Sequence, residues 1–489
     1  MARATLRFLR RGHVVELSSF SPTRTLLDYL RLDEKSKGTK EGCNEGDCGA
    51  CTVALGSLEN GHVVYEPVNA CIVLLGQIDG KELVTVDDLA TNGKLHPVQK
   101  AFVSSHASQC GFCTPGFVMA LFTLYHAGKR PTRQEIVDHI AGNLCRCTGY
   151  RPIVDAALKS CNGKPADAWS WGAKETAEQL AALNDGEDVV VGDSHSFFAA
   201  PATQDALAKL AAGHPDATIV AGATDVGLWV TKQLRTLPKI IYVGRADRLD
   251  EIVDHDAYVS IGATATYADA ASHLAAIDPD IGEVISRIGA KQVRSCGTIG
   301  GNIANGSPIG DTPPMLIALG ATLHLRHGTS ERSLPLENFF VAYGSQDRKA
   351  GELVWRIDVP KLKANELFRC YKISKRRDQD ISAVMGAFKF TFDVRRIVSA
   401  RVAFGGMAAT PKRAPKTEAA LAEIAIDDPL SWGKAIAMLQ QDYQPIADMR
   451  ASAEYRLEMA EVMLSKALME IVSGQTSATR VAGHRGVGP

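Results

Sequence analysis

The chain has 489 residues, of which 45% are hydrophobic and 22% are charged, so wholesale disorder is excluded. Lys and Arg number 54 against 55 Asp and Glu, and this balance argues against a nucleic-acid partner, which needs a cationic surface. The longest apolar stretch, around residues 116–125, is far shorter than the roughly 20 residues of a membrane span. No apolar signal region follows the basic N-terminal residues, so we expect a cytoplasmic protein with no membrane span.

Residues 1–82 contain short runs in which apolar and polar side chains alternate, separated by glycine-rich turns. Such runs predict strands, and they lie at Thr5–Phe8, His13–Leu17, Thr52–Leu55 and His62–Tyr65. A helical stretch around Thr25 to Arg31 completes a small α+β domain. The Arg10-Arg11 pair falls between the first two runs, and we therefore predict that it belongs to a hairpin.

Residues 83–160 change to helical periodicity and predict an all-α bundle. Thr114 and Pro115 are typical of an N-cap and the first position of a helix. Thr132 and Glu135 have the spacing of a capping box, which predicts the start of another helix. Further helices are expected at 97–106 and 152–160.

Four parts follow the bundle. Residues 161–190 are polar and rich in Ala, and we interpret them as a partly helical linker. In residues 191–365, strand-like runs alternate with helices, and in residues 366–475 strands are followed by helices, so both are predicted α+β domains. Residues 476–489 have little apolar content and are expected to form a flexible tail.

The cysteines cluster in the first part of the chain. Of the eleven, eight fall in two tight groups, and only Cys161, Cys296 and Cys370 lie outside them, without an assigned role. The first group is Cys43, Cys48, Cys51 and Cys71. Its C-x4-C-x2-C spacing, in a loop rich in glycine, is typical of a plant-type [2Fe–2S] cluster. A structural zinc site is the alternative, but zinc sites usually pair two short C-x2-C knuckles.

The second group is Cys110, Cys113, Cys145 and Cys147. Both pairs fall at predicted helix ends, where the partial positive charge of a helix N-terminus favours thiolates. Taken alone, this group is also compatible with zinc. Beside the first loop, a second [2Fe–2S] cluster is the better interpretation, and two clusters in one chain predict an electron relay.

Three long motifs carry a family resemblance: GCNEGDCGACTV at 42–53, SQCGFCTPG at 108–116 and GNLCRCTGYRP at 142–152. They resemble the iron–sulfur region of the molybdenum hydroxylases and, within that superfamily, the small subunit of bacterial xanthine dehydrogenases. The resemblance implies a multidomain α+β fold: a ferredoxin-like β-grasp domain, a four-helix iron–sulfur bundle, an FAD-binding α+β domain of the vanillyl-alcohol-oxidase type and a small C-terminal α+β domain. It also implies that the second cluster lies nearer molybdenum, and that Gln109 and Cys147 approach a pterin held by a partner chain.

Two glycine-rich segments remain, at 219–227 and 297–311, and neither matches a Rossmann or P-loop fingerprint. Each can bring backbone N–H groups close to a pyrophosphate, although either alone is more often an ordinary turn. Two such segments downstream of two clusters favour a flavin, which converts single electrons to hydride.

These segments are similar to the FAD-binding loops of the same family. The resemblance implies FAD contacts from two runs and four single residues: Ile219, Val220, Ala221, Gly222, Ala223, Thr224, Asp225, Val226, Thr298, Ile299, Gly300, Gly301, Asn302, Ile288, Asp311, Val354 and Lys372. The stretch 372–381 resembles the charged loop beside the isoalloxazine, although a solvated turn is the alternative. Gln379 stands where relatives often carry an acid, which leaves open whether NAD or oxygen takes the electrons.

The resemblance also implies the partners. No segment is left for a molybdenum-binding half, so we expect a separate large subunit that holds the molybdenum cofactor, in a heterotetramer of two small and two large subunits. The expected reaction is hydroxylation of hypoxanthine and xanthine to urate, with electrons passing through both clusters and FAD to NAD. The substrate pocket would lie on the partner chain.

Two other functions remain open. The chain is also compatible with the iron–sulfur and flavin subunit of an aldehyde, carbon monoxide or N-heterocycle dehydrogenase, although those relatives often keep the two parts on separate chains. A non-enzymatic iron–sulfur redox sensor is a third hypothesis, against which the intact FAD loops count.

Overall fold

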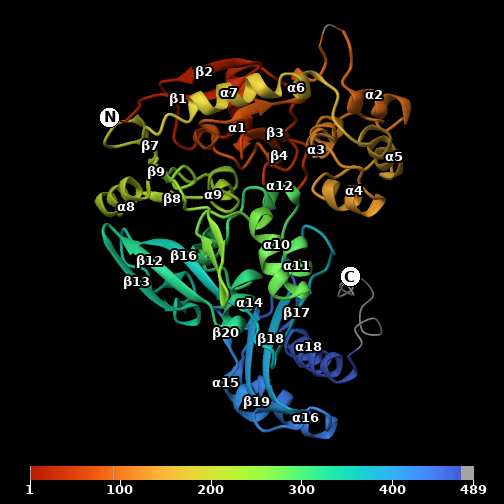
Figure 1. Cartoon of the computed structure of the whole chain (residues 1–489), viewed down its shortest axis with the longest axis vertical. Coiled ribbons are helices and arrows are strands. Elements are labelled where there is room, and N and C mark those ends of the chain that lie inside the picture. The colour runs from red at the N-terminus through yellow and green to blue at the C-terminus, as the bar shows by residue number, and fades with distance from the viewer. Residues whose placement is uncertain (1, 92, 475–489) are drawn as a thin grey trace. The chain divides into compact units, whose positions relative to one another are not determined.

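The computed structural model describes residues 2–91 and 93–474, so the predicted tail at 476–489 lies outside the described residues (Figure 1). The chain forms two compact units. The first runs up to Asp247 and also contains Gly289–Gly297. The second contains Arg248–Ile288 and the residues from Thr298 onward.

The first unit begins with a five-stranded sheet of order β2-β1-β5-β3-β4. The strands β1 and β5 are parallel, and the other neighbours are antiparallel. The bounds are β1 Leu6–Arg10, β2 His13–Leu17, β3 Thr52–Glu59, β4 His62–Asn69 and β5 Glu82–Val84, with α1 Leu26–Asp28, η1 Tyr29–Asp33, η2 Leu75–Ile78 and η3 Val86–Asp88 between them. Arg11, in the β1–β2 turn, has the left-handed φ of 53° that a tight hairpin requires, so the predicted hairpin is confirmed.

Four helices follow and form the predicted bundle: α2 Pro97–Ser104, α3 Thr114–His126, α4 Arg133–Ile140 and α5 Arg151–Ser160. The predicted capping box is present, because the Glu135 N–H donates to Thr132 Oγ1 at 3.2 Å and the Thr132 N–H donates to the Glu135 carboxylate at 2.6 Å. The predicted start of α3 is wrong by one residue. Cys113 is the N-cap, and Thr114 lies inside the helix with its hydroxyl 2.7 Å from that of Ser108.

The predicted linker is partly helical, with α6 Ala168–Trp171 and α7 Ala173–Leu183. After it comes a four-stranded sheet of order β6-β7-β9-β8, in which β7, β9 and β8 are parallel. The elements are β6 Val189–Gly192, β7 Phe197–Ala200, α8 Gln204–Gly213, β8 Thr218–Val220, α9 Val226–Thr231, β9 Lys239–Tyr242 and, in the segment that returns to this unit, α12 Lys291–Arg294.

The second unit contains an antiparallel sheet of order β10-β11-β16-β12-β13 and helices that pack on it. These elements are β10 Ile252–Asp254, β11 Tyr258–Gly262, α10 Tyr267–Ile277, α11 Pro279–Ser286, α13 Ile299–Asn305, α14 Thr312–Leu319, β12 Thr322–His327, β13 Ser330–Pro335, η4 Leu336–Asn338, the short hairpin β14 Phe340–Ala342 and β15 Ser345–Gln346, and β16 Leu353–Pro360. A second antiparallel sheet, β17-β18-β19-β20, is followed by helices, as predicted. Its elements are β17 Glu366–Ile373, β18 Val384–Asp393, β19 Arg396–Gly405, β20 Lys412–Arg413, α15 Pro415–Leu421, α16 Pro429–Ala437, α17 Leu439–Asp442 and α18 Ala453–Ser473.

Both units contain helices and sheets in separate layers, so the predicted multidomain α+β class is confirmed. The bundle core extends onto the first sheet, because Ala54 of β3 and Tyr65 of β4 belong to the same buried cluster as Phe117 and Phe122 of α3. Sheet and bundle are therefore packed as one body in the first unit. In the part of the chain that the structure describes, every helix is too short or too polar to span a membrane.

Candidate functional site

The first cysteine group lies in the loop before β3 and in the turn after β4. Its thiols come together in two hydrogen-bonded pairs, Cys43 with Cys48 and Cys51 with Cys71. The backbone N–H groups of Asp47 and Cys48 both donate to Cys43 Sγ at 3.3 Å. The hydrogen bond from the Cys48 thiol, joined by these N–H groups, lowers the pKa of Cys43 to about 5. The same hydrogen bond, together with burial, raises the pKa of Cys48, and the bond to Cys51 together with burial raises that of Cys71. The loop therefore favours negative charge on the sulfur of Cys43.

The second group lies at the ends of bundle helices. Cys110 and Cys113 precede α3, whereas Cys145 and Cys147 lie between α4 and α5. Their thiols again form two pairs, Cys113 with Cys145 and Cys110 with Cys147. Burial and the bond to Cys145 raise the pKa of Cys113 to about 12. Burial also acts to raise the pKa of Cys145, but hydrogen bonds from the Thr148 side chain and backbone outweigh it, so the net pKa is lowered.

The pairing distinguishes the two metal hypotheses. A structural zinc ion needs four ligand atoms around one point, whereas each iron of a [2Fe–2S] cluster takes two thiolates. Within residues 2–91 and 93–474, no three of the eight cysteines converge closely enough to hold a single ion. Two close pairs in each group are the arrangement expected for the ligands of a two-iron cluster.

The first glycine-rich segment belongs to the first unit. Ile219 and Val220 end β8, Val226 begins α9, and the residues between them form a tight loop with Ala223 at a left-handed φ of 58°. A Cβ added at Gly222 would overlap the carbonyl oxygen of Cys296, so only glycine allows this close approach. Burial raises the pKa of Asp225 above the ordinary value, although a hydrogen bond with Trp229 opposes the shift.

The second glycine-rich segment belongs to the second unit and forms the start of α13. Thr298 is the N-cap, and its hydroxyl accepts a hydrogen bond from the Gly301 N–H at 2.9 Å. Gly300 packs against the backbone of Ala263, which leaves no room for a Cβ. The buried Oδ1 of Asn302 has no hydrogen-bond partner. Since buried polar atoms are almost always satisfied, Asn302 fits a site that a polar ligand completes.

Three of the single predicted FAD residues lie close together in the second unit. The Lys372 ammonium, on β17, lies 2.6 Å from the Asp311 carboxylate and donates to the carbonyl oxygen of Arg287, which precedes Ile288, at 3.2 Å. The Ser382 hydroxyl also donates to Asp311. This buried pair orients both side chains without help from solvent. Val354 lies on β16 and packs against the core of the same unit.

The other residues singled out in the sequence lie in the charged loop after β17 and on the helical bundle. Gln379 lies in the charged loop with a left-handed φ of 52°, and the Arg376 N–H donates to Asp380 at 2.8 Å in the same loop. Gln109 and Cys147 are exposed on the bundle, and their approach to a pterin stays a prediction. Cys161, Cys296 and Cys370 belong to neither cysteine group, and Cys161 is buried in the bundle core.

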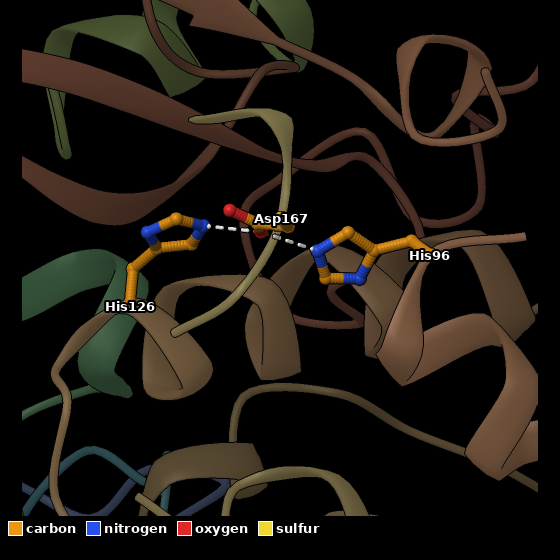
Figure 2. Close-up of side chains that lie close together, drawn as sticks. All are labelled: His96, His126 and Asp167. Atoms are coloured by element: carbon orange, nitrogen blue, oxygen red, sulfur yellow. Dashed lines mark hydrogen bonds and ion pairs between the residues drawn. The ribbon is translucent and has the colours of Figure 1, made fainter. Parts of the chain in front are cut away.

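Sequence reasoning missed a buried polar hub in the first unit. Asp167, the N-cap of α6, accepts hydrogen bonds from His96 Nε2 at 2.7 Å and His126 Nε2 at 2.9 Å (Figure 2). These are the one set of three potential metal ligands that converge among the described residues. However, the Val98 N–H donates to His96 Nδ1 at 3.2 Å, which places the ring proton on Nε2. A protonated Nε2 cannot bind a metal, so the hub ties the linker to the bundle by hydrogen bonds.

Sequence reasoning also missed two buried amides, Asn143 and Gln292. Gln292 Nε2 donates to Asn143 Oδ1 at 2.8 Å and to Thr52 Oγ1 at 3.2 Å. The residues are far apart in the sequence, and no spacing rule joins them. The only feature of the sequence that could have pointed to this contact is that Asn143 and Thr52 each lie within two residues of a cysteine, Cys145 and Cys51.

Four families match successive parts of the chain. Their descriptions are "2Fe-2S iron-sulfur cluster binding domain" over residues 12–75, "[2Fe-2S] binding domain" over 85–158, "FAD binding domain in molybdopterin dehydrogenase" over 193–362 and "CO dehydrogenase flavoprotein C-terminal domain" over 369–471. The two iron–sulfur matches cover the two cysteine groups, and the FAD-binding match covers both glycine-rich segments.

Among curated proteins, the chain is similar to the xanthine dehydrogenase of Emericella nidulans, with 30% identity over 504 residues, which are 90% of this chain and 36% of that protein. It is similarly related to the xanthine dehydrogenase/oxidase of Rattus norvegicus, with 31% identity over 469 residues, 85% of this chain and 35% of that protein. The chain therefore spans about a third of the length of these relatives.

Among solved structures, the chain resembles a carbon monoxide dehydrogenase from Hydrogenophaga pseudoflava, with a TM-score of 0.53, 26% identity, and coverage of 57% of this chain and 98% of that one. A quinoline 2-oxidoreductase from Pseudomonas putida 86 shares the fold, with a TM-score of 0.52, 23% identity and coverage of 58% and 98%. The chain carries two [2Fe–2S] domains and an FAD-binding domain, and it belongs to the molybdenum hydroxylases as a chain that unites their iron–sulfur and flavin parts.

Proposed function

We propose that the chain is the electron-transfer subunit of a xanthine dehydrogenase. When the cofactors are bound, they supply one-electron transfer from a molybdenum centre through two [2Fe–2S] clusters to FAD, and then hydride transfer to NAD. The observation that carries the proposal is the arrangement of eight thiols in four hydrogen-bonded pairs, on the same chain as the FAD-binding match.

We assign cluster ligands by group. One cluster takes Cys43, Cys48, Cys51 and Cys71, and the other takes Cys110, Cys113, Cys145 and Cys147. The N–H groups that donate to Cys43 lower the cost of charge on the sulfur at this site. In the second group, Thr148 does the same for Cys145.

For FAD we assign the seventeen contacts predicted from the sequence, in the runs 219–226 and 298–302 and at the four single positions. Gly222 and Gly300 permit close backbone approach, and the unpartnered Asn302 Oδ1 accepts from the ligand. The pair Lys372–Asp311 holds a fixed positive charge beside a carboxylate that Ser382 orients. These side chains bind and orient the flavin, while NAD takes the electrons.

The xanthine assignment is supported by the curated relatives, which are named xanthine dehydrogenases and match this chain across the iron–sulfur and flavin parts together. The solved carbon monoxide dehydrogenase chain, by contrast, is covered almost completely by little more than half of this chain. That solved chain therefore corresponds to only part of what is joined in this chain. We therefore propose a separate large subunit for the molybdenum cofactor, in a cytoplasmic heterotetramer of two small and two large subunits.

A second candidate is the same role in a carbon monoxide, aldehyde or N-heterocycle dehydrogenase. It is favoured by the solved neighbours, which are a carbon monoxide dehydrogenase and, at the level of fold, a quinoline oxidoreductase. The redox sensor is disfavoured by the FAD-binding match.

The test is to co-purify the native complex and to screen NAD reduction with xanthine, hypoxanthine, carbon monoxide, an aldehyde and quinoline. We expect turnover with the two purines, about four irons and one FAD on this chain, and the molybdenum on the co-purified partner. The isolated chain should oxidise NADH with ferricyanide but not xanthine. Turnover with carbon monoxide alone would replace the xanthine assignment, and a chain that contains only zinc would refute both candidates.

A further inference from the structure

A short segment, Gly289–Gly297, belongs to the first unit although the residues on both sides of it belong to the second. It is anchored to β4 at two points. The Lys291 ammonium lies 2.8 Å from the Glu66 carboxylate, and the Ser295 hydroxyl donates to the same carboxylate at 2.6 Å. Between these anchors, α12 directs the side chain of Gln292 into the protein, where it is 1% exposed.

The side chain of Gln292 ends between two loops, which we call the cysteine loops: residues 43–51 before β3, and residues 141–150 between α4 and α5. Its Nε2 donates to Thr52 Oγ1 at 3.2 Å, beside Cys51 of the first group. The same nitrogen donates to Asn143 Oδ1 at 2.8 Å, and Asn143 closely precedes Cys145 of the second group. One side chain from the flavin-matched part of the chain therefore bridges both loops.

The two loops are also in direct contact. Asn143 Nδ2 donates to the Gly49 carbonyl at 2.9 Å and to Thr52 Oγ1 at 3.1 Å. The Leu144 N–H donates to the carbonyl oxygen of Cys48 at 2.9 Å. A Cβ added at Gly49 would overlap the carbonyl oxygen of Gly142, so the loops meet backbone to backbone. Their spacing is therefore set by hydrogen bonds and not by compressible side chains.

Burying the Gln292 amide costs free energy that an apolar side chain at this position would not. Its Oε1 is buried without a hydrogen-bond partner and lies against Gly142. A buried oxygen without a hydrogen bond destabilises the folded chain, and an apolar side chain of the same length would avoid this cost. The amide is thus explained by what its Nε2 donates to.

We propose that Gln292 is a positioning residue that fixes the spacing of the two cysteine loops, and with it the spacing of the two [2Fe–2S] clusters. The inference deepens the proposed function and rests on it, because it takes the eight cysteines as the cluster ligands. Electron transfer between centres depends steeply on their separation, so a side chain that locks the two loops together protects the relay from fluctuations of either loop.

The test compares Gln292→Met with Ser295→Ala in the full-length protein carrying both clusters. Methionine keeps the length and flexibility of glutamine but donates no hydrogen bond. Ser295→Ala removes the hydroxyl that bonds Glu66 and the Lys291 carbonyl in the same segment, without touching either loop. With both clusters reduced, low-temperature EPR measures their magnetic interaction, which weakens with the cube of the distance between the spins.

We expect Gln292→Met to keep its iron and FAD but to show a smaller and broader interaction splitting, whereas Ser295→Ala keeps the splitting of the unmodified protein. Two variants of Thr52 keep the test valid if Gln292→Met loses a cluster. Thr52→Val should show the same smaller and broader splitting, whereas Thr52→Ser, which keeps the hydroxyl, should keep the splitting of the unmodified protein. Unchanged splitting in both Gln292→Met and Thr52→Val, or an equal change in Ser295→Ala, overturns the inference. Absence of two [2Fe–2S] signals in the unmodified protein would instead refute the proposed function.

Discussion

Replacing Asp167 with asparagine tests whether the polar hub holds the linker on the bundle. The Asp167 side chain is only 3% exposed and accepts hydrogen bonds from His96, from His126 and, at 2.8 Å, from the Ser170 N–H. Burial alone would raise the pKa of Asp167, but the bonds from His126 and His96 outweigh it, and the net pKa is lowered. The carboxylate is therefore ionised at neutral pH, and all three bonds are charge-assisted.

The magnitude follows from these contacts. Hydrogen bonds to a charged group contribute about 1.5–3 kcal/mol each, and the amide nitrogen of asparagine cannot accept one. The variant loses at least one bond and the charge on the others, so the free energy of opening the α6 segment should fall by roughly 2–3 kcal/mol. Because each 1.4 kcal/mol is a factor of ten, amide exchange through local opening should accelerate by roughly 30- to 150-fold.

Hydrogen–deuterium exchange followed by mass spectrometry, at pH 7 on the intact chain, measures this effect in peptides that cover α6. Because the pKa of Asp167 is lower in the folded than in the unfolded chain, its ionised form stabilises the fold fully at any pH above the unfolded-state pKa. This stabilisation is lost as the pH falls toward the folded-state pKa, so a measurement at neutral pH reports the full effect. The matched control is Glu178→Gln in α7, whose partner Lys174 is 3.9 Å away and 92% exposed. Equal exchange of α6 in Asp167→Asn and in the unmodified protein would refute the role of the hub.

Three further predictions concern the cofactor sites and the bundle. Gly300→Ala should lower the flavin content measured by absorbance, because a Cβ there overlaps the Ala263 backbone, whereas Gly213→Ala, which has open space, should not. Cys43→Ser should remove or distort only one [2Fe–2S] EPR signal and Cys145→Ser only the other; loss of both signals in either variant would contradict the assigned groups. Desolvation lowers the pKa of the half-buried His139 from 6.5 to about 4. Lowering the pH from 7 to 5 should therefore destabilise the unmodified protein by about 1–2 kcal/mol more than His139→Gln, as followed by calorimetry. Equal pH dependence of the two proteins would contradict a neutral His139 ring.

The local features of the fold could be predicted because their signals are local. The capping box of Thr132 and Glu135 and the hairpin at Arg11 depend on residues within a few positions of one another. The start of α3 could not be placed as well, because Thr114 has a competing partner in Ser108. Helix termini are decided by such side-chain competition, which periodicity does not register.

The cysteine groups were predictable for the same reason, since ligands of one loop follow one another at fixed spacing. How the groups meet was not predictable. The Leu144 to Cys48 hydrogen bond and the bridge from Gln292 join segments that lie far apart in the chain. The hub at Asp167 is of the same kind, because its histidines come from the residue before α2 and the end of α3. Tertiary packing decides these contacts, and a single sequence carries no pattern for them.

The segment Gly289–Gly297 shows why such contacts matter for function. Gln292 bridges the two cysteine loops, and the carbonyl oxygen of Cys296 occupies the space that glycine leaves at position 222 in the first glycine-rich segment. The chain then continues without a break into Thr298, the N-cap that opens the second glycine-rich segment. One continuous stretch, residues 289–298, therefore carries the contacts to both cysteine loops, the contact to the first glycine-rich segment and the N-cap of the second, so cofactor loops that lie far apart in the sequence are tied to the same piece of backbone.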